Sequence, residues 1–228
     1  MMRMDPIFRV AATVVVAISA LSAARAQLGP NLVVNGSFEE PISDNQWRFN
    51  PATWFAGQSF LGWTVTQGSI DIKRRNDSFP PDGRQFVDLN GSPGIGGIAQ
   101  TIVISDPGLY RLSFAMNANF RDISRNVLRT MVVRLRDPNG IDLHNATYTY
   151  DPLRPNRNWD FYQVDIAITV VGNYTLSFTS TTDDPPINDT GPLIDDVRLQ
   201  LVPEPASMLA LGTGLVGLLA RRRRQARA

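Results

Sequence analysis

The stretch Gly108-Leu109-Tyr110-Arg111-Leu112-Ser113-Phe114 returns 64 residues later as Gly172-Asn173-Tyr174-Thr175-Leu176-Ser177-Phe178. Successive side chains of a β-strand point to opposite faces, so Tyr, Leu and Phe of each copy share one face and Ser takes the other. We interpret the two copies as equivalent strands that face one core. Two copies are too few for a solenoid, which favours a single sandwich.

Working outward from this repeat, the chain shows period-2 alternation in short stretches that end at Gly, Pro, Asn or Asp, and almost no helical periodicity. About ten strands without a helix predict an all-β fold, an antiparallel β-sandwich. Residues 41–60 are expected to form a long aromatic loop. The expected strands cover residues 31–34, 63–72, 85–89, 98–104, 108–115, 127–136, 146–150, 161–170, 173–179 and 193–201.

Both ends of the chain differ from this body. Arg3 and Arg9 precede the apolar run 10–20, and Ala24-Arg25-Ala26 has the small residues that signal peptidase prefers. Residues 1–26 therefore predict a signal peptide. The alternative, an uncleaved membrane anchor, is opposed by the shortness of that run. The sandwich is therefore expected to cover residues 27–202.

At the other end, Pro203-Glu204-Pro205 precedes the uncharged run 206–220 and the cluster Arg221-Arg222-Arg223-Arg224. Fifteen helical residues span about 22 Å, and snorkelling arginines with local thinning of the bilayer can make up the difference to about 30 Å. Residues 203–228 therefore predict a sorting tail with a transmembrane segment at 206–220 and its arginines in the cytoplasm.

Charge and composition exclude several functional classes. The formal net charge of +1 is misleading, because residues 27–203 hold 14 basic and 19 acidic residues and so carry a net charge of −5. An acidic body without a basic stripe opposes nucleic-acid binding. The absence of Cys excludes disulfides and thiolate sites, and the single histidine, His144, excludes multi-His metal motifs.

The order of Pro203-Glu204-Pro205, an apolar run and a terminal Arg cluster resembles the PEP-CTERM sorting signal of Gram-negative bacteria that make exopolysaccharide. The resemblance implies export through the general secretory route, with signal peptidase and an exosortase as processing partners. It also implies transient anchoring in the inner membrane, followed by release to the cell surface or the extracellular matrix.

The body resembles the choice-of-anchor C domain. The shared motifs are Asn31-Leu32-Val33-Val34-Asn35-Gly36-Ser37-Phe38-Glu39, Gly62-Trp63-Thr64-Val65, Asp82-Gly83, Val87-Asp88-Leu89-Asn90-Gly91, Gln100-Thr101, the Gly-x-Tyr-x-Leu-Ser-Phe segment and Ile194-Asp195-Asp196-Val197. Such domains are similar to galactose-binding-like jelly rolls, so the resemblance implies that fold and carbohydrate binding.

The same resemblance implies a structural calcium ion, held by Glu39 after the first strand and Asp195 in the last. Strand parity places Asp195 on the core side with Val197 and Leu199, where an ionised carboxylate is costly unless it is paired or bound to a metal. Oxygen ligands suit Ca²⁺. The alternative is that backbone N–H groups cap Asp195 without a metal.

Aromatic side chains are the candidate carbohydrate-binding residues. Trp47, Trp54 and Phe55 lie in the expected loop, and Trp159 precedes a strand whose buried face has the opposite parity. Flat rings stack on the apolar C–H faces of sugars, while polar neighbours hold the hydroxyls. The alternative is that these rings cover open edges of the sandwich, whereas Trp63, at the head of a strand, is expected in the core.

The sequence thus favours an exported, non-catalytic carbohydrate-binding β-sandwich associated with exopolysaccharide and biofilm, whose partner is an extracellular polysaccharide or cell-wall glycan. A structural or adhesion protein of the matrix without a sugar site is the alternative. A surface glycoside hydrolase is a weaker third hypothesis, because Asp next to Gly, Pro or Asn is usually a turn residue. The carboxylates available for such chemistry are Asp82, Asp88, Asp183 and Asp184.

Overall fold

A computed structural model describes residues 27–42, 52–74, 79–92, 94–119, 127–183, 185 and 188–203. Residues 30–201 form one compact unit. The signal peptide, Trp47, the apolar run 206–220, Glu204, Pro205 and the Arg cluster lie outside the described residues. Among those that are described, we find no helix long and apolar enough to cross a membrane.

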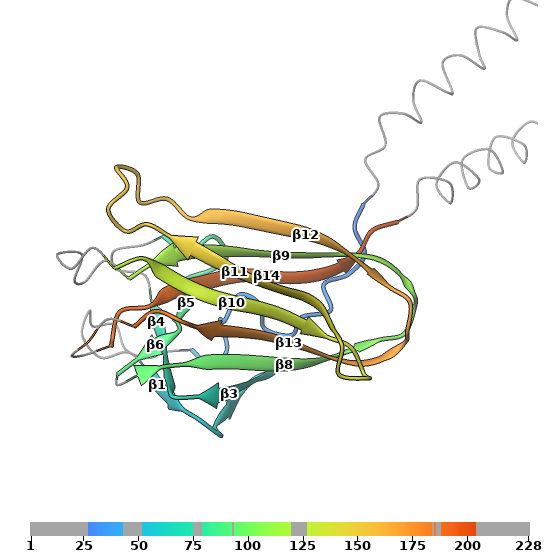
Figure 1. Ribbon diagram of the computed structural model, residues 1–228, viewed down its shortest axis with the longest axis horizontal. Coiled ribbons are helices and arrows are strands. Elements are labelled where there is room, and N and C mark those ends of the chain that lie inside the picture. The colour runs from blue at the N-terminus through green and yellow to red at the C-terminus, as the bar shows by residue number, and fades with distance from the viewer. Residues whose placement is uncertain are drawn as a thin grey trace, which may run out of the picture. The chain divides into compact units, whose positions relative to one another are not determined.

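The unit consists of two six-stranded antiparallel sheets, here called sheet A and sheet B (Figure 1). Sheet A has the order β1 (Ala52–Phe55), β4 (Ser69–Arg74), β5 (Gln85–Asp88), β14 (Pro192–Leu201), β9 (Gly108–Ala118) and β12 (Asp160–Ile168). Sheet B has the order β11 (Asp142–Tyr150), β10 (Arg129–Arg136), β13 (Gly172–Ser180), β8 (Gly97–Ile104), β3 (Trp63–Gln67) and β2 (Ser59–Phe60). The short strands β6 (Asn90–Gly91) and β7 (Gly94–Ile95) pair with each other. The expected all-β antiparallel sandwich is confirmed.

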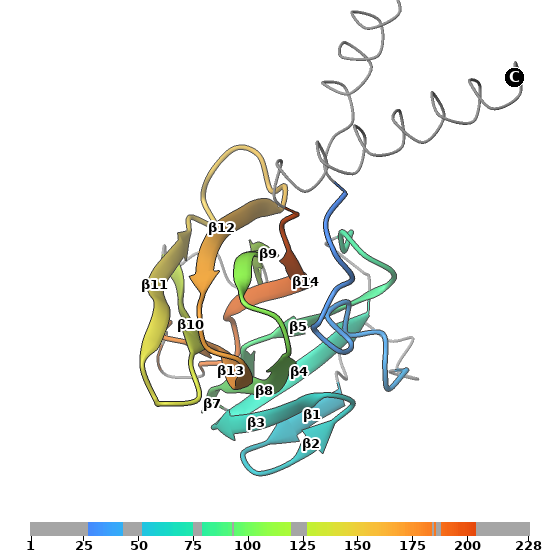
Figure 2. The same ribbon diagram turned by 90° about the vertical axis from the view of Figure 1, so that its right-hand side faces the viewer.

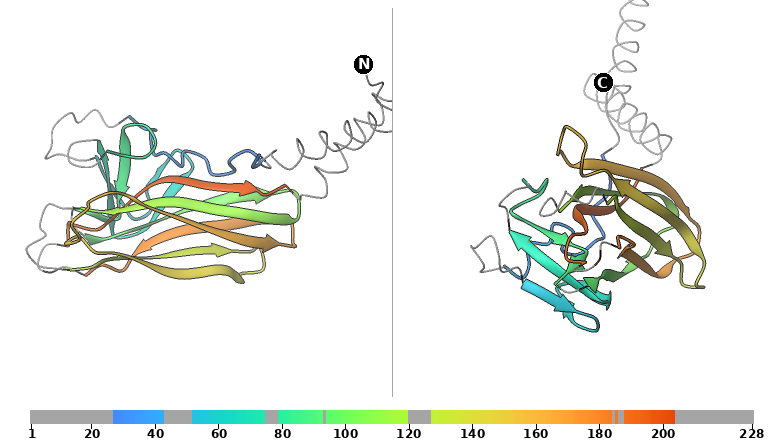
Figure 3. Two further views of the ribbon diagram at one scale, coloured as in Figure 1. Left: turned by 90° about the horizontal axis from the view of Figure 1, so that it is seen from above. Right: turned by 60° about the vertical axis from the view of Figure 1, so that its left-hand side comes forward.

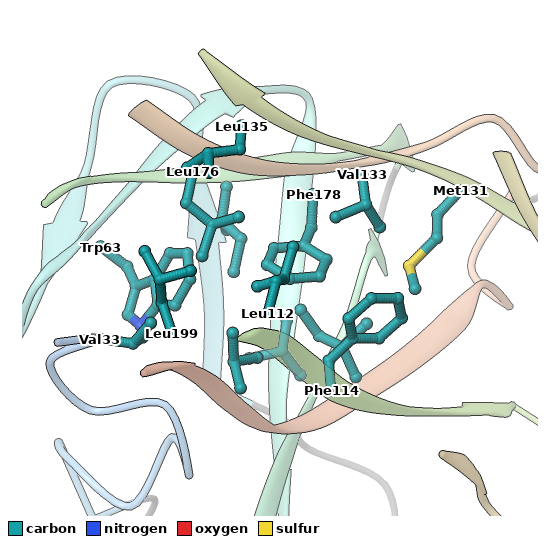
Figure 4. Close-up of a cluster of buried hydrophobic side chains, with 14 of the residues drawn as sticks. Val33, Trp63, Leu112, Phe114, Met131, Val133, Leu135, Leu176, Phe178 and Leu199 are labelled. Carbon is teal, nitrogen blue, oxygen red and sulfur yellow. The ribbon is translucent and has the colours of Figure 1, made fainter. Parts of the chain in front are cut away.

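The repeated motif forms one central strand of each sheet. Tyr, Leu and Phe of β9 and of β13 are all buried, and Figure 4 shows Leu112 and Phe114 facing Leu176 and Phe178 across the core. The two Phe rings meet edge to face with centroids 5.4 Å apart. Trp63 is also buried, as expected, and its ring packs against Phe178.

The two tyrosines of the repeat also make equivalent hydrogen bonds. The hydroxyl of Tyr110 donates to the carbonyl of Asp106 at 2.8 Å, and that of Tyr174 donates to the carbonyl of Val170 at 2.6 Å. Each bond closes the turn that precedes its strand, because the acceptor lies four residues earlier in both cases. Each copy of the repeated motif therefore stabilises a turn and forms a core-facing strand.

Three expectations about strand boundaries are wrong. Residues 31–34 are not a strand, because the side chain of Asn31 and two turns organise this segment. The expected strand 63–72 is two strands in different sheets, since the chain turns at Gly68 with a φ of 51°. The expected loop 41–60 contains β1 and β2.

One end of the unit collects the turns between β8 and β9, β10 and β11, and β12 and β13, together with the end of β14. Gly108 pairs with Ile168, Gly172 pairs with Ile104, and Leu201 pairs with Tyr110. Figure 2 faces this end. The N-terminal segment joins it, because Leu32 N–H donates to the carbonyl of Leu199, and Figure 3 shows this segment beside β14.

Candidate functional site

The outer face of sheet A carries a line of accessible polar side chains across three strands. The register pairs Gln163 of β12 with Ser113 of β9, and Ser113 with Arg198 of β14. Neighbouring strands lie about 4.8 Å apart, so these three side chains span about 10 Å. Phe161, two residues before Gln163 on the same face, is 69% exposed. We call Phe161, Gln163, Ser113 and Arg198 the sheet A strip.

The strip ends at a polar pocket of about 290 Å³. Arg198 lies between two carboxylates there: its Nε is 2.5 Å from Asp196 and its Nη2 is 3.5 Å from Asp82. These two ion pairs hold the guanidinium in place at the boundary between strip and pocket. The pocket is lined by Asn31, Val33, Asn35, Gly36, Ser37, Asp82, Asp196, Val197 and Arg198.

Irregular backbone shapes this pocket. Asn35 and Asp196 have φ values of 53° and 52°, in the left-handed region that asparagine and aspartate tolerate better than most residues. Gly36 lies so close to β14 that a Cβ there would be 2.0 Å from the carbonyl oxygen of Val197. The N-terminal segment can therefore form the pocket wall only with glycine at this position.

Asp195 lies on the outer face of sheet A, so the expectation that it faces the core with Leu199 is wrong. A register shift between Asp195 and Arg198 inserts one extra residue at Asp196, which turns Asp195 toward the side of Ala115. Its side chain is nevertheless fully buried. Burial raises the pKa of Asp195 to about 8, although a hydrogen bond from the backbone N–H of Asp82 opposes the shift.

Glu39 and Asp195, the candidate calcium ligands, both contact the segment from Asp82 to Gln85. Oε1 of Glu39 accepts the backbone N–H groups of Arg84 and Gln85 at 2.6 Å each. Oδ2 of Asp195 accepts the N–H of Asp82 at 3.0 Å, while its Oδ1 is buried without a hydrogen-bond partner in the described part of the chain. That buried oxygen fits a cation ligand.

The described residues contain no group of three or more His, Cys, Asp or Glu side chains that could hold a metal. Glu39 and Asp195 would therefore have to be completed by backbone carbonyls or water, which Ca²⁺ accepts. The backbone N–H groups also partly satisfy both carboxylates, as the alternative without a metal requires. The calcium ion stays a prediction.

The aromatic candidates occupy different environments. Trp54 is partly buried against the core, with its ring 5.5 Å from that of Phe60, and Phe55 is exposed on the other face of β1. Trp159 packs edge-on against Phe86 at 5.8 Å, and its Nε1 is buried without a partner among the described residues. Trp47 lies outside the described part. Their role in sugar binding stays a prediction.

The carboxylate Asp88 is a structural group. It is fully buried and accepts from Lys73 at 2.6 Å, from Asn119, and from the backbone N–H groups of Asn90 and Gly191. Its cross-strand partner Asp71 is also buried, which raises its pKa although the Thr53 hydroxyl donates to it. Neither carboxylate is open to a substrate. Asp183 is exposed, and Asp184 lies outside the described residues.

His144, the single histidine, faces the core side of β11, with Nε2 3.2 Å from the hydroxyl of Tyr148. Partial burial lowers the pKa of His144. The strand expected to start at residue 146 starts earlier, at Asp142, and His144 lies within it, paired with Leu135.

Sequence reasoning missed the sheet A strip. The alternation of β12 did assign Phe161 to the outer face, but Gln163, Ser113 and Arg198 are ordinary polar residues 35 to 85 positions apart. These residues become neighbours only through the register of β12, β9 and β14. The register shift at Asp196 determines that the side chain of Arg198 lies on the outer face of sheet A.

Residues 31–200 match the family described as "Protein of unknown function (DUF642)", which is most of the chain. The chain belongs to this DUF642 family. Residues 201–224 match the PEP-CTERM protein-sorting motif, which marks a bacterial protein for export and processing by an exosortase. The comparison with curated proteins gives no match.

Several solved structures are similar to the DUF642 domain, and one of them, TmCBM61, shares its fold. TmCBM61, solved in complex with β-1,4-galactotriose, is 14% identical, with a TM-score of 0.50 over 75% of this chain and 98% of that one. The CBM22-1 xylan-binding domain from Paenibacillus barcinonensis Xyn10C is 17% identical, with a TM-score of 0.46 over 78% and 99%. A CBM4 structure is 19% identical, with a TM-score of 0.43 over 74% and 98%.

Proposed function

We propose that this DUF642 protein is an exported, non-catalytic carbohydrate-binding protein whose glycan lies along the sheet A strip. The observation that carries the proposal is an exposed phenylalanine beside a row of three polar side chains on one sheet face. The proposal is supported by the fold shared with TmCBM61, a module solved with a galactotriose bound.

The chemistry of the strip suits a sugar chain. The ring of Phe161 offers an apolar surface for the C–H face of one sugar unit. Gln163 and Ser113 can donate to and accept from hydroxyls, and Arg198 adds fixed donors beside the acceptor oxygens of Asp82 and Asp196. The net charge of −5 over residues 27–203 favours neutral or cation-bridged glycans over free polyanions.

A binding role fits these groups better than hydrolysis does. Acid–base hydrolysis of a glycoside requires two carboxyls held about 5 to 10 Å apart across the scissile bond. On this face Asp82 and Asp196 are both paired with Arg198, Asp165 is paired with Arg111, and Asp195 is fully buried. A release of reducing ends from polysaccharides by the purified protein would contradict the non-catalytic part of the proposal.

The sorting motif supports the proposed location. A chain with a PEP-CTERM motif is exported and held in the membrane transiently, so its body meets extracellular polymers. We propose that the glycan is the exopolysaccharide of the producing Gram-negative bacterium and that the processed protein resides at the cell surface or in the biofilm matrix.

The test is a glycan array combined with pull-downs on the producer's own exopolysaccharide. We expect retention of the purified protein and at least a tenfold weaker affinity for Phe161→Ala, since an aromatic contact of this kind contributes about 1.4 kcal/mol. Phe79→Ala is the matched control, because Phe79 is equally exposed and lies outside the strip. No retention on any glycan would favour a structural or adhesion role.

The structural calcium ion remains part of this proposal. A cation at Glu39 and Asp195 would join the segments around Phe38 and β14 and so support the pocket beside the strip. Thermal unfolding with excess CaCl₂ and with EDTA tests it. We expect a higher Tm with calcium in the parent and no difference in Asp195→Asn. An equal Tm in both buffers would indicate that backbone N–H groups bind Asp195 without a metal ion.

A further inference from the structure

The end of the DUF642 domain at which β14 terminates carries five exposed aliphatic side chains. They come from three different connections and are between 41% and 67% exposed. We call them the terminal rim. Its members are Val103 at the end of β8, Leu109 at the start of β9, Ile141 in the β10–β11 turn, and Val170 and Val171 in the β12–β13 turn.

Strand pairing places these residues at one end. Val103 pairs with Asn173, two residues after Val171, and Leu109 pairs with Ala167, three residues before Val170. The β10–β11 turn meets the β12–β13 turn, because a Cβ on Gly172 would be 2.9 Å from Cγ of Pro138. The rim therefore surrounds the same end of the sandwich that Figure 2 faces.

Charge at this end is sparse. Asp106 is exposed in the β8–β9 turn, and Arg134 and Arg136 share the carboxylate of Asp142 at 3.2 and 2.8 Å. Asp137, in the β10–β11 turn, is buried and bonds to the backbone N–H groups of Asn139 and Ile141. Exposed aliphatic groups with few free charges are costly in water and suit a surface that removes them from it.

The short connection between β14 and the sorting motif identifies that surface as the lipid bilayer. Strand β14 ends at Leu201, and the apolar run of the sorting motif starts at Ala206. Five residues reach at most about 18 Å when fully extended. While the run spans the bilayer, the end of β14 must stay within that distance of the lipid, and the rim surrounds it.

We propose that the terminal rim lies against the lipid bilayer while the sorting tail is inserted. This inference rests on the anchored state in the proposed function. A short tether raises the effective concentration of the rim at the membrane, so a weak aliphatic contact is enough. A specific protein partner is less well matched, because five aliphatic residues on separate turns fall short of the area of about 800 Å² per partner in a stable interface.

This orientation has a consequence for the strip. Phe161 precedes Ile168, at the rim end of β12, by seven residues, or about 23 Å along the strand. The bilayer would therefore meet the turns and leave the aromatic end of the sheet A strip open to extracellular polymer before processing.

The chain contains no cysteine, so single labels can be placed on it cleanly. We would reconstitute the full chain, labelled with an environment-sensitive fluorophore, into phosphatidylcholine vesicles that contain nitroxide-labelled lipid. Three variants carry the label: Val171→Cys in the rim, Thr149→Cys as an exposed position near the opposite end of β11, and Gly212→Cys in the apolar run.

We expect strong quenching of the Gly212→Cys label, at least about twofold quenching of the Val171→Cys label, and none for Thr149→Cys. Adding Leu109→Ser and Ile141→Ser to Val171→Cys should reduce its quenching. Equal emission from the Val171→Cys and Thr149→Cys labels, with Gly212→Cys quenched, overturns the rim contact alone. An unquenched Gly212→Cys label overturns the anchored state and the inference with it. A change in the Val171→Cys emission that requires exosortase and is independent of the nitroxide-labelled lipid would assign the rim to a protein partner and contradict a lipid contact.

Discussion

The two sheets are nearly equivalent on their inner faces and different on their outer faces. β9 and β13 present the same Tyr, Leu and Phe to the core, and both tyrosines close a turn with the same hydrogen bond. Outside, β13 of sheet B carries Thr175, Ser177 and Thr179 among other small polar residues. On the outer face of sheet A, β12, β9 and β14 carry Phe161, Gln163, Ser113 and Arg198.

This difference separates the residues that specify the fold from those that we assign to function. The inner residues alternate with strict period 2 and need only be apolar and of the right volume. The outer residues gain nothing from the core, so an exposed phenylalanine on the same sheet face as a positioned arginine calls for another explanation. The proposed glycan binding is such an explanation.

The largest expected effects test the equivalence of the inner faces. Phe114→Ala and Phe178→Ala should each lower the free energy of unfolding by about 3–5 kcal/mol, since each removes a buried ring from the same contact. Urea unfolding followed by tryptophan fluorescence measures both. A loss from only one of the two would show that the sheets do not share one core.

A second comparison concerns ion pairs on the outer faces. Lys73→Ala in sheet A should cost about 3 kcal/mol, because it leaves the buried Asp88 carboxylate without its cation. Arg134→Ala in sheet B breaks an accessible pair with Asp142 and should cost less than about 1 kcal/mol. The same unfolding experiment applies, and similar costs for the two variants would argue against a structural role for Asp88.

A third comparison concerns the glycan affinity of polar variants on the outer faces of the two sheets. Arg198→Ala should weaken glycan binding about tenfold, since it removes the donors held between Asp82 and Asp196. Thr175→Ala, on the outer face of sheet B, should leave the affinity unchanged. Affinity electrophoresis in gels containing the exopolysaccharide measures both, and equal retardation of the two variants contradicts the assignment to sheet A.

The smallest expected effects on stability concern the two tyrosines of the repeated motif. Tyr110→Phe and Tyr174→Phe each remove one hydroxyl bond to a carbonyl four residues earlier. Each should cost about 1 kcal/mol. Thermal unfolding monitored by circular dichroism is sensitive enough, and a cost more than twice as large for one tyrosine would show that the two turns are not equivalent.

The sequence predicts those parts of the molecule that depend on local alternation. The antiparallel sandwich and the outward position of Phe161 follow from strand parity, and the core position of Trp63 follows from its place at the head of a strand. Parity fails where the backbone departs from a regular strand. Gly68 redirects one expected strand into a second sheet, and the bulge at Asp196 moves Asp195 to the outer face.

The strip and the pocket could not be predicted for a related reason. Ser113 and Arg198 become neighbours only through the pairing of β9 with β14, and Asn31 reaches Val197 across 166 residues. Such contacts depend on register, which period-2 patterns leave open whenever the outer residues are all polar.

The most direct test of the central claim is a map of the glycan contact. Backbone amide chemical shifts of the isotope-labelled protein would be followed by NMR during titration with an oligosaccharide from the producer's exopolysaccharide. The account predicts shifts at Phe161 and Gln163 of β12, Ser113 of β9 and Arg198 of β14, with β8 and β13 unchanged. Shifts confined to sheet B, or to the region of Trp54 and Phe55, would contradict it.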